Sequence, residues 1–212
     1  MTVGNIQNGL FRSFVEAIVS GDSLAAIQML DAVPQLAKEC AAHGAIRQAA
    51  KQNFFDQIKH YMYEGDTALH MAAAAYQTTV AAALITKGAD VRSRNRRGAA
   101  PLHYAADGGP DLPAWNPHAQ TEIIAMLIRA GADANAIDKS GVSPLHRAVR
   151  NRCSAAVRAL VEAGADPVAP NKNGSTPMLL ATQNTGKSGS GSVGSKAQQE
   201  EILHFLRECG CR

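Results

Sequence analysis

Residues 98–106 read GAAPLHYAA, and this stretch decides the fold because the chain repeats it. Residues 65–73 read GDTALHMAA, residues 141–149 read GVSPLHRAV, and residues 174–181 read GSTPMLLA, a weaker copy. The opening glycines of these copies are 33, 43 and 33 residues apart. A repeat of this length is typical of a solenoid, in which each unit buries its apolar face against its neighbours.

A second motif recurs in phase with the first. Residues 84–90 read LITKGAD, residues 127–133 read LIRAGAD, and residues 160–166 read LVEAGAD. The proline of the first motif suits the first turn of a helix, where its missing N–H removes no hydrogen bond. The glycine of the second motif suits the left-handed residue that ends a helix. Each unit is therefore predicted to contain two short helices.

Together the two motifs resemble the ankyrin repeat, which has a 33-residue period, a TPLHxA motif and a later LLxxGAD motif. The resemblance covers about residues 65–212. It implies an all-α solenoid of stacked helix-turn-helix units with short hairpin-like fingers. Four repeats are expected, at residues 65–97, 98–140, 141–173 and 174–212.

Three regions depart from the period. Residues 1–64 are expected to form a helical capping region, in which residues 34–64 replace a finger with a helical excursion centred on residues 45–61. The second repeat has an insert near residues 108–118, whose three prolines prevent a simple extension of a helix. The fourth repeat has a Gly/Ser-rich insert near residues 186–195, which is interpreted as flexible, before a closing helix at about residues 196–208.

Composition sets broad limits on function. Of the 212 residues, 46% are hydrophobic and 18% charged, which indicates a globular protein. No apolar run is long enough for a membrane helix, and the N-terminus lacks the pattern of a secretory signal. The four cysteines follow no disulfide framework, so thiols in a reducing cytoplasm are expected. A net charge of +3 is too small by itself to indicate nucleic acid.

No motif predicts an enzyme, a cofactor or a bound metal. Gly186, Lys187 and Ser188 superficially fit a phosphate loop, but the strand before and the helix after such a loop are not expected here. The single pair Cys209 and Cys211 does not supply the two pairs of ligands usual in metal sites.

A histidine recurs once per repeat, at His70, His103 and His146. Stacked units would hold these side chains roughly 10 Å apart, whereas zinc needs its ligands within roughly 2 Å. The resemblance implies instead that this histidine is a structural hydrogen bonder that joins neighbouring turns.

The resemblance also implies a protein-interaction scaffold, since ankyrin domains bind partners through finger tips and first-helix surfaces that form a concave groove. Four arginines fall within six residues of the first finger, and nothing in folding is expected to gather them, which favours a basic rim for an acidic partner. Asp66 is also expected at the surface. Trp115 is expected on the side away from the fingers, where it either makes a separate contact or packs on its own repeat. The predicted partner-binding residues are Arg92, Arg94, Arg96, Arg97, Asp107, Trp115, Lys139, Arg147, Arg150, Asn151 and Lys172.

Two alternatives remain at this point. The arginine-rich finger could bind nucleic acid, although aromatic residues for base stacking are sparse at 5%. The chain could also be an effector or an immunity-type binding protein, which the sequence does not settle. The protein is expected to be a cytoplasmic monomer.

Overall fold

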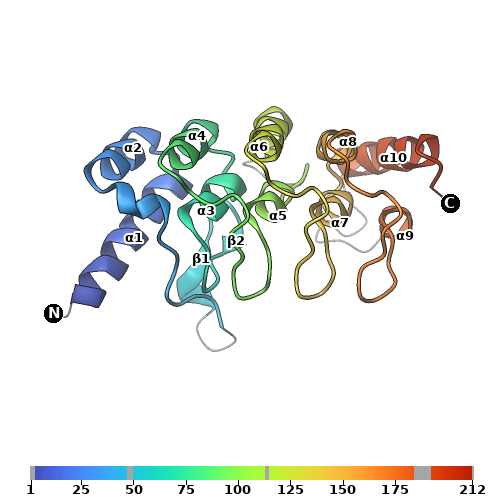
Figure 1. The fold of residues 1–212 in the computed structure, drawn as a ribbon. Coiled ribbons are helices and arrows are strands. Elements are labelled where there is room, and N and C mark those ends of the chain that lie inside the picture. The colour runs from blue at the N-terminus through green and yellow to red at the C-terminus, as the bar shows by residue number, and fades with distance from the viewer. Residues whose placement is uncertain (1–2, 47–49, 113–114, 184–191, 212) are drawn as a thin grey trace.

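A computed structural model describes residues 3–46, 50–112, 115–183 and 192–211. Over these residues the chain forms a solenoid of paired helices (Figure 1), as the sequence predicts. No helix in these ranges is long and apolar enough to cross a membrane. The inner row of helices consists of α1 (Val3–Ser20), α3 (Ala68–Ala74), α5 (Pro101–Ala105), α7 (Pro144–Arg150) and α9 (Pro177–Thr182).

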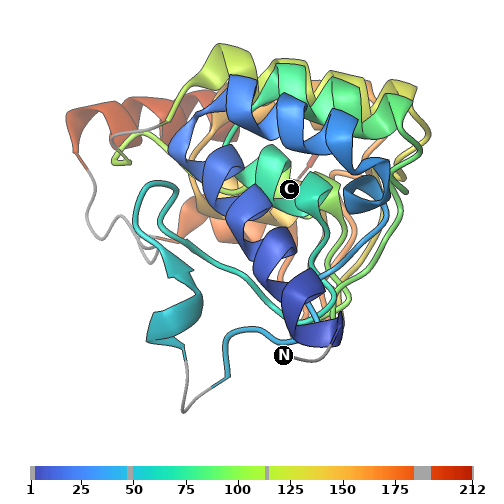
Figure 2. The same cartoon turned by 90° about the vertical axis from the view of Figure 1, so that its left-hand side faces the viewer.

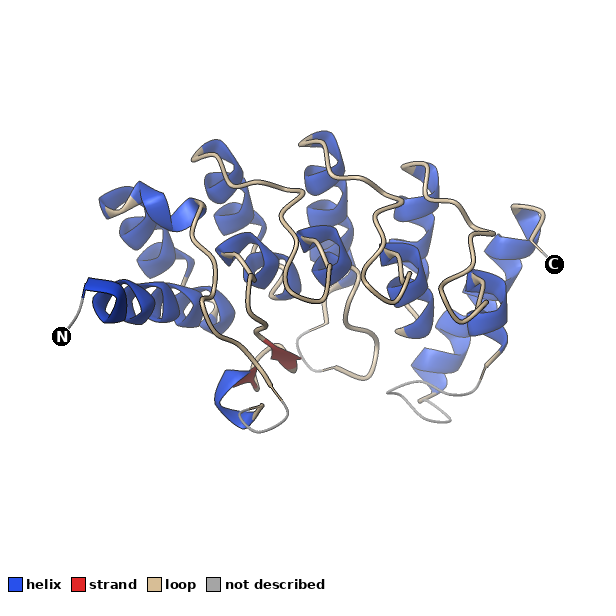
Figure 3. Ribbon diagram, turned by 60° about the horizontal axis from the view of Figure 1, so that its bottom comes forward, coloured by secondary structure: helices blue, strands red, loops and turns tan. Residues whose placement is uncertain are grey.

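The outer row packs above the inner one, and loops hang below as a row of fingers (Figures 1 and 3). The outer row consists of α2 (Ser23–Ala32), α4 (Thr78–Thr86), α6 (Pro117–Arg129), α8 (Ser154–Glu162) and α10 (Val193–Glu208). Leu69, Leu102 and Leu145 of the inner helices are fully buried, so the core runs along the whole stack between the two rows. Burying this apolar stripe is what holds each short helix in place.

The helix ends have the predicted chemistry. Thr176 caps α9 by accepting a hydrogen bond from the Leu179 N–H at 3.2 Å. After α4, α6 and α8 the backbone turns at Gly88, Gly131 and Gly164, which have φ values of 88°, 97° and 91°. A side chain is disfavoured in this left-handed region, so glycine ends each outer helix.

One histidine per unit joins that unit to the next. The Nδ1 atom of His103 accepts a hydrogen bond from the Ala100 N–H at 3.1 Å, and its Nε2 lies 3.0 Å from the Val142 carbonyl oxygen of the following finger. Because a backbone N–H can only donate, the imidazole proton is on Nε2 and is donated to that carbonyl. His70 and His146 make the equivalent bond to their next finger, each at 3.1 Å. The predicted structural role of the histidines is confirmed.

The predicted helical excursion over residues 34–64 is wrong. The segment contains two short 3-10 helices, Pro34–Ala37 and Lys51–Asn53, and an antiparallel hairpin of β1 (Phe54–Phe55) and β2 (His60–Tyr61). Phe54 pairs with Tyr61, and their ring centroids are 4.7 Å apart. Aromatic residues favour strands because they pack across a pleated surface, and this preference outweighs the helical tendency of the flanking alanines. The hairpin lies under the inner helices on the side opposite the fingers (Figure 2).

The insert of the fourth repeat is more ordered at its end than predicted. Helix α10 begins at Val193 because Ser192 caps it, accepting a hydrogen bond from the Ser195 N–H at 3.1 Å. Ser195 is buried and donates its hydroxyl to Asp111 at 2.7 Å, which ties this turn to the insert of the second repeat. Residues 184–191, where the rest of the predicted flexible insert falls, lie outside the described ranges.

The first prediction concerns the histidine bridge. His103→Ala removes the acceptor of the buried Ala100 N–H and one of the two donors to the Val142 carbonyl, which keeps only the Asp138 N–H. We therefore expect it to lower the free energy of unfolding by about 1–3 kcal/mol. Urea denaturation measures this. His118→Ala, at an exposed position of α6, is the control and is expected to change stability by less than about 0.5 kcal/mol. Equal effects of the two substitutions would contradict the structural role. A metal chelator is expected to leave the free energy of unfolding of both variants unchanged.

The second prediction concerns pH. Burial lowers the pKa of His103 to about 4, against about 6.5 when the chain is unfolded. Between these values the unfolded chain binds more protons, so stability is lost as the pH falls from about 6.5 to about 4, by about 3 kcal/mol for this residue. Denaturation midpoints at about pH 7 and about pH 5 test this. His103→Ala is expected to flatten the dependence, and an unchanged slope in this variant would contradict the assignment.

Candidate functional site

Each finger turns around one buried polar side chain. The Oδ1 atom of Asn95 accepts hydrogen bonds from the N–H groups of Arg97 and Ala99, at 2.9 and 3.0 Å. Asp138 and Asn171 occupy the equivalent positions in the next two fingers and accept the equivalent pairs of bonds, at distances from 2.8 to 3.1 Å. The only carboxylate among these three turning side chains is therefore directed inward, away from the finger tips.

The residue after each buried polar side chain is an exposed cation. Arg96, Lys139 and Lys172 follow one another along the fingers, and we call them the cation row. Their backbone N–H groups donate to the preceding finger, to carbonyl oxygens of Glu64, Arg97 and Ser140 at 2.8, 2.9 and 3.2 Å respectively. The fingers are thereby linked tip to tip, and the cations lie one per unit.

Two glycines allow this close stacking. A Cβ atom on Gly98 would lie 3.0 Å from the Lys139 nitrogen, and one on Gly141 would lie 2.7 Å from the Lys172 nitrogen. Both glycines also have positive φ values, 77° and 72°. A larger residue at either position would push the fingers apart, so the spacing of the cation row is fixed by the backbone.

The arginines of the first finger have structural partners that the sequence does not reveal. The Nε atom of Arg92 donates to the Gly131 carbonyl at 2.6 Å, and Nη1 of Arg94 donates to the Ile137 carbonyl at 2.5 Å. Both bonds link this finger to the next unit. The expectation that nothing in folding gathers these arginines is therefore wrong, although both side chains remain exposed.

Arg96 and Arg97 contact the hairpin-containing segment instead. Arg96 donates to the Ala45 carbonyl. Arg97 donates to the Tyr63 hydroxyl at 2.8 Å, and its guanidinium carbon lies 4.9 Å from the centre of that ring. Part of each positive charge is satisfied in this way, but the two side chains are still exposed. The side chains of Lys139 and Lys172 make no hydrogen bond or ion pair with the described residues, and Arg150 is also exposed.

Asp66, expected at the surface, is fully buried. Its carboxylate accepts hydrogen bonds from the Tyr63 N–H, the Asn95 amide and the Tyr104 hydroxyl, at 2.6, 2.8 and 2.7 Å. Burial and the nearby Asp66 raise the pKa of Tyr104 well above its usual value, so the hydroxyl remains a donor. Asp66 therefore anchors the first finger to the segment before it.

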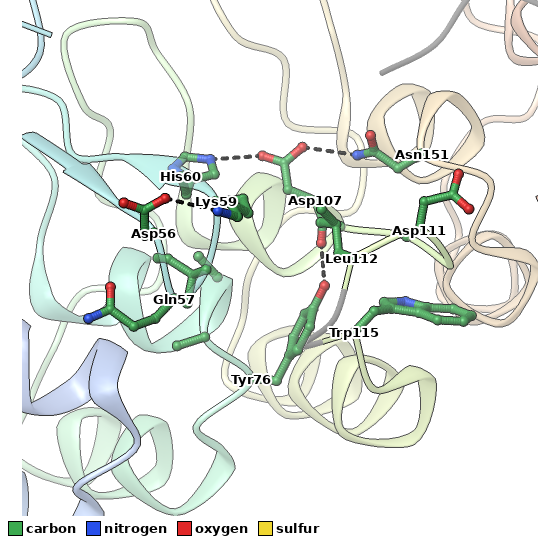
Figure 4. A pocket seen from close by; sticks show the side chains of 15 residues that line it. Asp56, Gln57, Lys59, His60, Tyr76, Asp107, Asp111, Leu112, Trp115 and Asn151 are labelled. Carbon is green, nitrogen blue, oxygen red and sulfur yellow. Dashed lines mark hydrogen bonds and ion pairs between the residues drawn. The ribbon is translucent and has the colours of Figure 1, made fainter. Parts of the chain in front are cut away.

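Asp107 is the centre of a second polar network (Figure 4). Arg147 donates to its Oδ2 at 2.6 Å, and His60 of the hairpin lies 3.2 Å from the same oxygen. Asn151 donates to Oδ1 at 3.2 Å, and the Tyr76 hydroxyl donates to the backbone carbonyl at 2.5 Å. One aspartate therefore connects the hairpin with the first three repeat units.

The ion pair in this network has little access to solvent. The side chains of Arg147 and Asp107 are 15% and 23% exposed, and Arg147 also lies 3.4 Å from Asp138. Burial by itself raises the pKa of Asp107, but Arg147 and His60 lower it more, so the pKa lies well below the usual range. Burial likewise lowers the pKa of Arg147, but Asp107, Tyr104 and Asp138 together outweigh it and the pKa is raised. Both groups stay charged, and they pair with each other inside the molecule.

Trp115 packs on its own repeat. Its indole Nε1 donates to Gln120 Oε1 at 2.9 Å, and the Gln120 amide in turn donates to the carbonyls of Ala105 and Asp107, at 3.1 and 3.2 Å. The ring is half-buried and packs against the hydrophobic core. This agrees with one of the two roles expected for it.

A pocket of about 400 Å³ lies between the hairpin turn, the end of α3 and the insert of the second repeat (Figure 4). Its carboxylates have partners: Asp56 pairs with Lys59 at 2.9 Å, Asp107 pairs with Arg147, and Asp111 accepts from Ser195. The geometry supports a wall held rigid by hydrogen bonds.

Sequence reasoning missed the residues through which the hairpin joins both networks. His60 contacts Asp107 and packs at a tilt against Tyr104, with ring centroids 4.4 Å apart, and Tyr63 contacts Arg97. The alternation of residues 60–63, which read HYMY, was the available signal for an extended segment. It could not show which distant residues the segment would contact.

Comparison with known families agrees with the repeat pattern. The family model described as ankyrin repeats, in three copies, matches residues 24–112 and again residues 114–212. The match therefore includes α2, which lies before the first repeat expected from the sequence. No curated protein matches the chain at a significant level.

The third prediction concerns the Asp107 network. Asp107→Asn leaves the Arg147 guanidinium without its closest carboxylate in a mostly buried setting, so we expect a loss of about 2–3 kcal/mol of unfolding free energy. Asp133→Asn at an exposed finger position is the matched control and is expected to cost less than about 0.5 kcal/mol. Chemical denaturation of both variants distinguishes them. A loss at position 107 no larger than that at position 133 would show that the network does not support the fold.

Proposed function

The chain belongs to the ankyrin-repeat family, and we propose that it is a protein-interaction module whose cation row binds an acidic partner protein. Ankyrin repeats are generally protein-protein interaction modules, so binding rather than catalysis is the starting expectation. The observation that carries the finer proposal is the direction of charge on the fingers. The turning carboxylate of Asp138 points inward, while Lys139 and Lys172 point outward without an internal partner among the described residues.

Several features make this surface suited to association. Arg92, Arg94 and Arg97 add positive charge beside the row and are held in place by bonds to backbone or to Tyr63. Side chains that are already ordered lose less conformational entropy when a partner binds. Clustered charges of one sign also accelerate the encounter with an oppositely charged protein.

The structure changes which of the predicted residues support this proposal. Asp107 and Arg147 neutralise each other, and Asn151 is bonded to the same carboxylate. Trp115 packs against the core and donates its indole N–H to Gln120. The proposed contact surface is therefore the finger tips, with Lys139 and Lys172 as its clearest members.

Nucleic acid is a weaker alternative. Binding of single strands usually combines a basic groove with aromatic side chains on which bases stack. Tyr63 lies beside the row, and the guanidinium carbons of Arg96 and Arg97 already lie over its ring, at 5.9 and 4.9 Å from its centre. A fluorescence-anisotropy titration of poly-L-glutamate and of an oligoribonucleotide, each over a salt series, separates the two. Tighter binding of the ribonucleotide would overturn the proposal.

The fourth prediction concerns charge reversal. Lys139→Glu together with Lys172→Glu is expected to lower the association rate for poly-L-glutamate at least about tenfold at low salt, because attraction becomes repulsion. Stopped-flow anisotropy measures the rate. The control pair Arg129→Glu and Arg207→Glu changes the net charge equally, from exposed positions on the outer helices. If both pairs slow association by the same factor, only total charge matters and the finger assignment fails.

A further inference from the structure

We propose that the cation row selects its partner by the spacing of acidic residues. It binds an extended segment in the polyproline II conformation that has an acidic residue at every third position. This inference rests on the proposed function, because it specifies which acidic protein segments the fingers select. The observations that carry it are the constant geometry of the row and the position of the exposed finger acids. Asp90, Asp133 and Asp166 lie at the start of their fingers, where each accepts a hydrogen bond from its own turn.

The row repeats once per unit with a fixed backbone geometry. Arg96, Lys139 and Lys172 each donate their N–H to the preceding finger, at 2.8, 2.9 and 3.2 Å. Gly98 and Gly141 bring the next finger so close that a Cβ atom would collide with it or nearly so. Neighbouring units of packed helices are about 10 Å apart, so this is the approximate spacing of the cations along the fingers.

The polyproline II helix has the matching period. It has three residues per turn and rises about 3.1 Å per residue, so residues three apart lie on one side at about 9 Å. A β-strand does not match, because its side chains alternate and residues three apart point to opposite faces. An α-helix would need residues seven apart, so presenting three acids would order about fifteen residues instead of seven, at a larger entropic cost.

The acidic side chains of these fingers bond within their own turns and do not pair with Lys139 or Lys172. Asp138 is buried within its turn, and Asp133 lies at the start of the same finger, where it accepts a hydrogen bond from the Asn135 N–H at 2.9 Å. Asp166 holds the next finger in the same way, through the Val168 N–H at 2.9 Å. The carboxylates of these two fingers thus serve their own turns, and the tips present Lys139 and Lys172 to solvent.

The partner chemistry that fits is a polypeptide with spaced carboxylates. Its backbone makes no internal hydrogen bonds in the polyproline II conformation and remains solvated, so binding needs only the side-chain contacts at the finger tips. The segment before the first repeat already occupies the neighbourhood of Arg96 and Arg97, through Ala45 and Tyr63. A thin extended chain along the tips avoids that segment.

Three peptides of equal composition test the spacing in the unaltered protein. One is three copies of Glu-Pro-Pro, the second places the three glutamates in succession before six prolines, and the third alternates glutamate and proline before the remaining prolines. We expect the period-three peptide to bind at least about fivefold more tightly than either of the others at low salt, measured by isothermal titration calorimetry or anisotropy.

Variants connect the effect to the row. Lys139→Glu is expected to lower the affinity for the period-three peptide at least about tenfold. Arg129→Glu, an equal charge change on an outer helix, is expected to change this affinity less than about twofold. Lys139→Gln provides a milder variant, expected to give an intermediate loss. Because the peptide comparison uses the unaltered chain, it does not depend on how any variant folds.

The outcomes separate this inference from the proposed function. Equal affinity for the three peptides, with Lys139→Glu weakening all of them, would overturn the spacing rule and leave binding of acidic proteins standing. Preference for a helical peptide with glutamates seven apart would overturn the polyproline II geometry. Absence of binding by every peptide, while poly-L-glutamate still binds, would also overturn it.

Discussion

The buried imidazole that bridges one unit to the next is the interaction on which the rest of the structure depends. His103 must be neutral, must carry its proton on Nε2, and must lie between the turn that starts its own helix and the Val142 carbonyl of the next finger. Short helices of five to nine residues, such as α5 and α8, would not persist alone. The bridge and the apolar stripe hold them together by fixing each helix against its neighbour.

The same bridge determines which side chains of the fingers are buried and which are exposed. Because each histidine bonds to a finger backbone, the fingers are held in register, and their turns bury Asn95, Asp138 and Asn171. The turning residue needs a side-chain oxygen to hold two backbone N–H groups, which consumes an amide or a carboxylate at every finger. The side chain of the following residue holds no backbone N–H group of the turn and is exposed to solvent. A positive surface thus arises from a chain whose net charge is only +3.

The segment before the first repeat shows how long-range contacts override local tendency. Its hairpin places His60 against Asp107 and beside the Tyr104 ring, so the segment is tied to the second repeat. Asp107 in turn holds Arg147 from the following unit. Charges that look available in the sequence are neutralised by these contacts. The inner-helix surface near the hairpin is consequently stiffened and partly covered, while the finger tips stay open.

The repeated motifs were enough to predict the solenoid and its helix pairs, because these depend on periodicity and on local rules for starting and ending helices. The role of the histidines followed from the resemblance that those motifs carry. It also located the arginine-rich finger. The hairpin of residues 54–61, the burial of Asp66 and the pairing of Asp107 with Arg147 became visible only in the folded chain. These outcomes depend on partners tens of residues away. Burial and hydrogen bonding are properties of the assembled stack, and a pattern within one repeat does not contain them.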